Sequence, residues 1–238
     1  MDEIEWWEFD SPAELAEQAA GDIGFVIESA VEAHQGARLA LPGGSEAEPV
    51  LSALVTHKEI DWSRVTLLPT DDLLVPLDDP RSARHRLADW FEAKGVEIVS
   101  LVDEAALEDY REAGRLADAR LALLHWPLDL VCLTMGGQGE VAGICPGPDL
   151  DRALTGPRER RAVGVRPDPA PADGSGDRVT LTAAALSSAR AVMIILSGAE
   201  KRALLEKAIE DGPLSRTPIG RLLAELDVPI DIFWSAKS

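Results

Sequence analysis

Short apolar runs alternate along this chain with longer stretches in which apolar residues recur every three or four positions. The short runs are typical of buried strands, and the longer stretches are typical of amphipathic helices. The pattern predicts strands at 37–41, 65–68, 96–101, 128–134, 179–182, 191–196 and 230–234. It predicts helices at 12–35, 49–57, 81–94, 104–125, 199–210 and 218–226, with one more short helix after residue 182.

This alternation indicates the fold class. Strands that are separated by helices of ten or more residues need crossover connections, which are right-handed and cover both faces of a parallel sheet. We therefore expect an α/β fold with a single doubly wound, mostly parallel sheet and helices on both faces, as in Rossmann-like proteins. The length of 238 residues suits one domain over 1–238, with the segment 167–176 of a Pro/Gly/Asp-rich stretch as a surface loop.

Four loops follow predicted strands, at 42–45, 70–73, 135–147 and 197–201. In a doubly wound sheet the carboxyl ends of the strands meet at one rim, where small molecules bind. We therefore expect a ligand site at this rim.

Two of these loops carry candidate binding groups. The backbone amides around Gly43, Gly44 and Ser45 could hold a phosphate, although a plain tight turn has the same sequence. Asp71 and Asp72 are paired carboxylates, of which one could orient a base or hold a hydroxyl. Helix capping or simple solvation explains such a pair equally well.

The loop 135–147 is the most distinctive segment, with four glycines between 136 and 143. Glu140 is the only ionisable residue among these glycines, and partial burial there would suit it to act as a general base. A glutamate that faces solvent remains the alternative. Cys145 could be a nucleophile only through a long-range contact with a histidine, because no histidine lies near it in the sequence.

Charge narrows the choice of partners. The chain has 23 basic and 42 acidic residues, a net charge of −19, which repels nucleic acid and anionic membranes. A phosphorylated ligand would therefore need a local basic patch, and the candidates are Arg81, Arg84, Arg86, Arg178, Lys201 and Arg202, each of which could equally be a solvated charge.

The lack of recognisable targeting signals makes a cytoplasmic protein the default expectation. No apolar run is long enough to span a bilayer, and the first residues lack the basic start of a signal peptide. Cys132 and Cys145 have no paired spacing, so we expect reduced thiols rather than a disulfide or a zinc site.

Motifs from one end of the chain to the other match a single family pattern. They are Asp61-Trp62-Ser63-Arg64-Val65, Val75-Pro76, Pro146-Gly147-Pro148-Asp149-Leu150, Arg178-Val179-Thr180-Leu181-Thr182, Gly198-Ala199-Glu200-Lys201, Pro213-Leu214-Ser215 and Thr217-Pro218-Ile219-Gly220. With these motifs the chain resembles the 6-phosphogluconolactonase family, which is related to the glucosamine-6-phosphate isomerases.

The resemblance implies a site, and this chain departs from it at several positions. The family's glycine loop carries an aspartate and a histidine, taken as the general base, where this chain has Gln138 and Glu140. An arginine that binds phosphate is replaced by Leu73, and a serine-asparagine pair by Ser82-Ala83. The positions that match are Gly43, Gly44, Asp71, Gly139, Arg178 and Lys201.

The resemblance therefore implies a lactonase of the pentose phosphate pathway that hydrolyses 6-phosphogluconolactone without metal or organic cofactor. Glu140 would be the base and Asp71 the second catalytic carboxylate. The substrate would contact Gly43, Gly44, Ser45, Leu73, Gly136, Gly137, Gln138, Gly139, Arg178 and Lys201.

The substitutions leave a second hypothesis open. The same scaffold could carry a recast, more apolar pocket, either a degenerate natural site or an engineered one. Such a pocket would bind a more apolar ligand or use Glu140 as a general base on another substrate. Under both hypotheses the partner is a small molecule, and the chain is a monomer or a small homo-oligomer.

Overall fold

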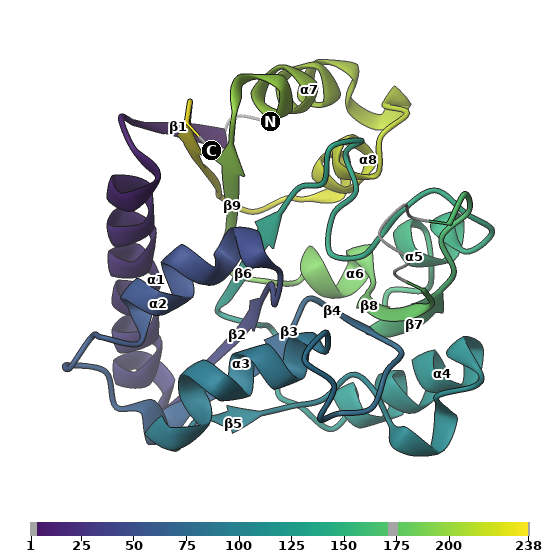
Figure 1. Cartoon of the computed structure of the whole chain (residues 1–238), viewed down its shortest axis with the longest axis horizontal. Helices are drawn as coiled ribbons and strands as arrows, with labels where there is room; N and C mark the ends of the chain where they lie inside the picture. The colour runs from purple at the N-terminus through teal and green to yellow at the C-terminus, as the bar shows by residue number, and fades with distance from the viewer. Residues whose placement is uncertain (1–3, 171–175, 238) are drawn as a thin grey trace.

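The computed structural model describes residues 4–170 and 176–237 and contains a seven-stranded sheet in which all strand pairs are parallel (Figure 1). The order of the strands is β1-β10-β9-β6-β2-β3-β5. Their bounds are β1 (Ile4–Phe9), β2 (Ala37–Leu41), β3 (Val65–Pro69), β5 (Glu97–Ile98), β6 (Leu130–Thr134), β9 (Val192–Ser197) and β10 (Ile230–Ser235). The predicted α/β class with a mostly parallel sheet is confirmed.

Helices cover both faces of this sheet, and each face has its own hydrophobic core. One core lies under α1 (Pro12–His34), α2 (Glu48–Leu54) and α3 (Ala83–Phe91). The other lies under α4 (Tyr110–Leu121), α5 (Leu150–Leu154), α6 (Ala183–Leu186), α7 (Ala199–Asp211) and α8 (Pro218–Glu225). Successive residues of a strand enter opposite cores, as the pleat requires; Leu39 enters the first and Ala40 the second.

Local sequence explains where these helices begin. Ser11 accepts a hydrogen bond from the Glu14 amide at 3.2 Å and Pro12 opens α1, which runs almost over the predicted range. The predicted helix 104–125 is shorter in the structure, because Asp109 accepts from the amides of Arg111 and Glu112 and so begins α4 at Tyr110. The strand β1 was not predicted.

A second, antiparallel sheet was also not predicted. It has the order β4-β8-β7, with β4 (Asp71–Leu73), β8 (Arg178–Leu181) and β7 (Ala162–Val165). The predicted strand 179–182 therefore belongs to this small sheet, and the expectation of a single sheet is corrected. β4 has only three residues, too few to show an alternating pattern.

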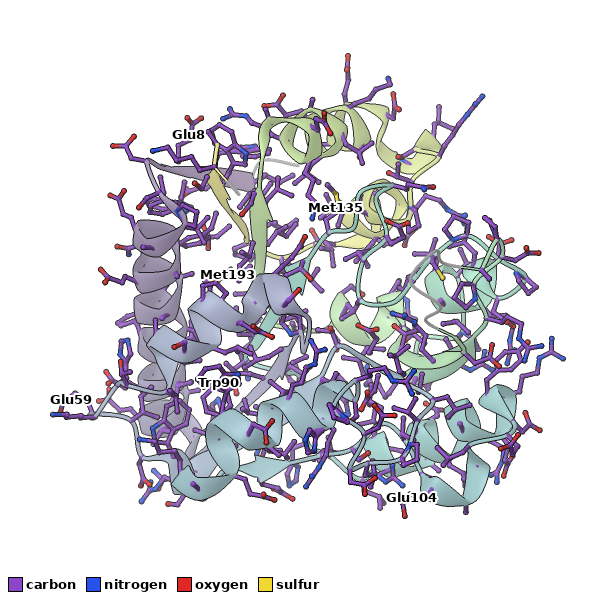
Figure 2. All side chains as sticks on the ribbon, in the orientation of Figure 1. Glu8, Glu59, Trp90, Glu104, Met135 and Met193 are labelled. Carbon is purple, nitrogen blue, oxygen red and sulfur yellow. The ribbon has the colours of Figure 1, made fainter. Side chains whose placement is uncertain are left out.

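The side chains follow the division between core and surface. Met135 and Met193 are buried, whereas Glu59 and Glu104 extend outward from the surface (Figure 2). The predicted surface loop 167–176 lies partly outside the described residues. In the part of the chain that the structure describes, no helix has the length and apolar character needed to cross a membrane.

Candidate active site

A cavity of about 870 Å³ opens at the carboxyl ends of β2, β3 and β6, where the loops after these strands meet β4 and β8. The cavity therefore lies at the expected rim. Of the predicted site residues, the cavity wall contains Gly43, Gly44, Ser45, Asp71, Leu73, Gly136, Gly137, Gln138, Glu140 and Arg178. Gly139 and Lys201 are not part of this wall.

The glycine loop is closed on itself around Glu140. The amide of Gly136 donates to the backbone carbonyl of Glu140 at 2.8 Å, and the amide of Gly139 donates to the carbonyl of Gly136 at 3.1 Å. The Glu140 carboxylate folds back over the loop, where Oε2 accepts from the Gln138 amide at 3.0 Å. A Cβ atom on Gly136 would collide with Glu140 Oε2, so a larger residue there would displace this carboxylate. Glu140 is half-buried, which is the condition that the sequence analysis set for a general base at this position.

The N–H of Gly137 is one of the loop donors that the described part of the chain leaves without an acceptor. The Gln138 amide binds the Glu140 side chain, and the amides of Gly136 and Gly139 bond within the loop. For the Gly137 amide there is no hydrogen-bond acceptor among the described residues. Gly137 lies in the cavity wall and is exposed, so its N–H can serve an oxygen of a bound ligand.

Gly139 shapes the loop instead of lining the cavity. Its φ is +82°, a conformation that favours glycine, and its carbonyl accepts from the Ile219 amide of α8 at 3.0 Å. A Cβ atom there would lie 2.7 Å from the Cβ of Thr217. Gly139 therefore fixes the loop against α8.

Asp71 and Arg178 form an ion pair in the cavity wall, with Arg178 Nη1 2.9 Å from Asp71 Oδ2. Leu73 lies directly opposite Arg178 in the β4–β8 ladder. Asp71 and Leu73 share one face of β4 because strand side chains alternate, and Arg178 faces the same side. Gly143 passes so close to the pair that a Cβ atom would lie 2.6 Å from Asp71 Oδ2.

Asp72 points to the opposite face of β4 and caps α3. Its carboxylate accepts from the Ala83 amide at 2.6 Å, the Arg84 amide at 3.1 Å and the Ser82 hydroxyl at 3.0 Å. Burial raises the pKa of Asp72 to about 6, against these hydrogen bonds, which lower it. The two neighbouring aspartates therefore differ in role: Asp71 pairs with Arg178 in the cavity wall, and Asp72 caps α3, as the capping alternative described.

Lys201 stands apart from the cavity wall and donates to Glu46 Oε1 in an ion pair. Glu46 follows Ser45 directly, so the pair lies at the edge of the loop that carries Gly43 and Gly44. The predicted phosphate cation is thus held by a carboxylate of the chain itself.

Three candidates from the sequence, Arg81 and Arg86 of the basic cluster and Cys145, also line the cavity. Ala83 and Pro146 complete this part of the wall. Burial raises the pKa of the Cys145 thiol, so that it is protonated near neutral pH and a poor nucleophile. No histidine is found among the described residues of the wall, which leaves the Cys/His dyad without its base.

Within residues 4–170 and 176–237, no three side chains of His, Cys, Asp or Glu lie close enough together to hold a metal ion.

Comparisons with known proteins agree with the motifs. Residues 10–229 match the family described as glucosamine-6-phosphate isomerases/6-phosphogluconolactonase. The 6-phosphogluconolactonase of Rhizobium meliloti is 32% identical over 230 residues, which cover 95% of this chain and 97% of that protein. The 6-phosphogluconolactonase of Mesorhizobium japonicum is 32% identical over 235 residues, with 97% and 94% of the two chains covered.

Solved structures share the fold over nearly the whole chain. A 6-phosphogluconolactonase from Shewanella baltica has a TM-score of 0.86 at 28% identity and covers 98% of both chains. The enzyme of that name from Trypanosoma brucei, at 20% identity and a TM-score of 0.83, covers 97% of this chain and 95% of its own and shares the fold. The chain therefore belongs to the glucosamine-6-phosphate isomerase/6-phosphogluconolactonase family.

Proposed function

We propose that this chain is a 6-phosphogluconolactonase-type ester hydrolase, which adds water to the ester bond of a sugar-acid lactone. The observation that carries the proposal is the position of Glu140. Its carboxylate stands where the resemblance places the family's histidine base, and it lies in the wall of the main cavity. Whole-length similarity to proteins of that name supports the same activity.

The proposed chemistry needs one base and one oxyanion donor. Glu140 takes a proton from a water molecule, whose oxygen attacks the lactone carbonyl carbon. The negative charge that develops on the carbonyl oxygen is stabilised by the Gly137 amide, a loop amide that has no acceptor among the described residues. The ring C–O bond then breaks, and Glu140 returns the proton to the leaving oxygen.

The phosphate of the substrate would be held by Arg178 and Lys201. Both cations carry a carboxylate partner in the structure, Asp71 and Glu46, so each must be shared with or released to the ligand. We assign Asp71 a positioning role, because its ion pair fixes Arg178 against the cavity. Gly43, Gly44, Ser45, Leu73, Gly136 and Gln138 complete the wall around the ligand.

The proposed activity also implies a substrate class, a cellular compartment and a pathway. The substrate is a small phosphorylated lactone, and we place the protein in the cytoplasm and its reaction in the pentose phosphate pathway. The net charge of −19 supports a small-molecule partner over nucleic acid or an anionic membrane.

The test is hydrolysis of fresh 6-phosphogluconolactone, measured against the spontaneous rate. We expect the wild-type chain to exceed that rate, and Glu140→Gln to lose about 100-fold or more, because the amide keeps the shape and removes the base. Glu200→Gln, an exposed charge on α7, is the control and should keep the wild-type rate. A wild-type rate at background, or full activity in Glu140→Gln, would overturn the proposal; ligand binding without turnover would favour the recast pocket.

A further inference from the structure

Among the arginines of the described cavity wall, Arg86 is the one whose charge is least neutralised by carboxylates of the chain. The described wall contains Arg81, Arg86 and Arg178. Arg178 lies 2.9 Å from Asp71, and Arg81 makes two bonds of 3.0 and 2.7 Å to Asp79. The Arg86 guanidinium has its carboxylate neighbour, Glu48, at 3.9 Å, and the Glu48 side chain is 53% exposed. The positive charge of Arg86 is thus the one most available to a ligand.

The fold holds this side chain in place and leaves donors free. Nε of Arg86 donates to the Pro80 carbonyl at 3.0 Å, and Nη1 donates to the Gly43 carbonyl at 3.3 Å. For Nη2, no acceptor occurs in the part of the chain that the structure describes. The Arg86 guanidinium is therefore oriented before a ligand binds, and its Nη2 can still donate to that ligand.

Helix α3 brings Arg86 to the loop after β2. Ala83 and Arg86 are three residues apart, on one face of the helix, and both line the cavity. A Cβ atom on Gly43 would lie 2.5 Å from Ala83 Cα, so the loop and the first turn of α3 are in direct contact. Gly43, Gly44 and Ser45 thus form the wall next to the guanidinium.

An anionic ligand needs such a charge, because the chain as a whole carries −19. A planar guanidinium with several N–H groups matches the oxygens of a phosphate and binds them more strongly than a neutral donor does. We propose that Arg86 binds the phosphate of a phosphorylated substrate and supplies the cation that is missing at Leu73. This inference rests on the proposed function, since it assigns a substrate contact within the same pocket.

The experiment compares two ligands that differ only in the phosphate, 6-phosphogluconate and gluconate, in calorimetric titrations of the intact chain. The variants are Arg86→Gln, which removes the charge, and Arg86→Lys, which keeps it. Arg84→Gln is the matched control, because Arg84 lies on the same helix, pairs with Glu92 at 3.6 Å and is not part of the cavity wall. Thermal unfolding shows whether each variant is folded.

We expect Arg86→Gln to weaken 6-phosphogluconate binding about tenfold or more and to leave gluconate binding unchanged. Arg86→Lys should lose less, and Arg84→Gln should match the wild type. Equal losses for both ligands, equal effects of Arg86→Gln and Arg84→Gln, or no binding of 6-phosphogluconate by the wild type would overturn the inference.

The lactonase assay separates this inference from the proposed function. A wild type that hydrolyses the lactone, with an unchanged KM in Arg86→Gln, would refute the role of Arg86 and leave the function standing. Binding of 6-phosphogluconate that depends on Arg86, without any turnover, would support the role of Arg86 and refute the function.

Discussion

Lys201 and Glu46 form an ion pair that joins the first turn of α7 to the loop after β2. The pair holds a cation that the family resemblance assigns to the substrate phosphate. Its two side chains are 21% and 50% exposed, so water competes for both charges and the pair contributes little to stability. A bound phosphate can therefore take the place of Glu46 at modest cost.

The first prediction follows from this competition. Glu46→Gln should tighten the binding of 6-phosphogluconate by up to about fivefold, because an exposed ion pair of roughly 1 kcal/mol no longer has to be broken. Titration calorimetry at low salt gives the two dissociation constants. Glu200→Gln removes the same charge one residue from Lys201, and it should have no such effect. Equal affinities for the Glu46→Gln variant and the wild type would show that Lys201 does not contact the phosphate.

The second prediction concerns pH and the buried carboxyl of Asp72. Its pKa in the folded chain is raised to about 6, above that of an unfolded aspartate, so the folded state holds the proton more tightly. The stability from this group is fully present below pH 4 and is lost as the pH rises through 6. The difference in unfolding free energy between the wild type and Asp72→Asn should therefore fall by up to about 3 kcal/mol between pH 4 and pH 7.

Chemical denaturation of both proteins across this pH range measures the difference, in which the titration of all other groups cancels. A difference that stays constant, or one that grows as the pH rises, would mean that the hydrogen bonds from Ser82, Ala83 and Arg84 outweigh the effect of burial.

The main sheet could be predicted from the sequence because its strands and helices have strong local signals. The apolar run of β2 and the capped start of α1 at Ser11 each specify their element without reference to distant residues. The small sheet could not be predicted in this way. β4 pairs with β8 across more than a hundred residues of sequence, and its Asp71-Asp72-Leu73 segment looks like a polar loop.

The site was predictable as a set of loops and not as a set of contacts. Glycines at strand ends located the cavity, whereas the sequence left open whether Glu140 is buried or faces solvent; in the structure it is half-buried in the cavity wall. The ion-pair partners of the charged site residues could not be predicted from the sequence, because Lys201 and Glu46 come together only in the folded chain. Arg86 belonged to a basic cluster in the sequence, and only the packing of α3 on Gly43 separates it from Arg84.

The third prediction tests the close approach of the glycine loop to the Asp71–Arg178 pair. Gly143 has a φ of +68°, and a Cβ atom would lie 2.6 Å from Asp71 Oδ2 and 2.8 Å from Arg178 Cδ. Gly143→Ala should destabilise the fold by about 2 kcal/mol or more, through the strained backbone and the collision. Gly44→Ala is the matched control, because a Cβ atom at position 44 would meet nothing within 4 Å and the φ of −77° at Gly44 suits any residue. Similar melting temperatures for the two variants would contradict the geometry of this loop.

The fourth prediction uses the position of Leu73 directly opposite Arg178 in the β4–β8 ladder. Leu73→Arg places two like charges side by side and should cost about 0.5–1 kcal/mol of stability without ligand. A phosphate that bridges both guanidinium groups would reverse this repulsion and tighten 6-phosphogluconate binding by about tenfold or more. Leu73→Gln, of similar length and without charge, should show neither effect.

The same substitution can be coupled to Arg86. If Leu73→Arg and Arg86 serve one phosphate, the loss of affinity caused by Arg86→Gln should be smaller in the Leu73→Arg background than in the wild type, because the new cation replaces part of the missing contact. Titration of 6-phosphogluconate into the four proteins of this double-mutant cycle gives the coupling free energy. Strict additivity would place the two side chains at separate parts of the ligand and would leave Arg178 as the partner of position 73.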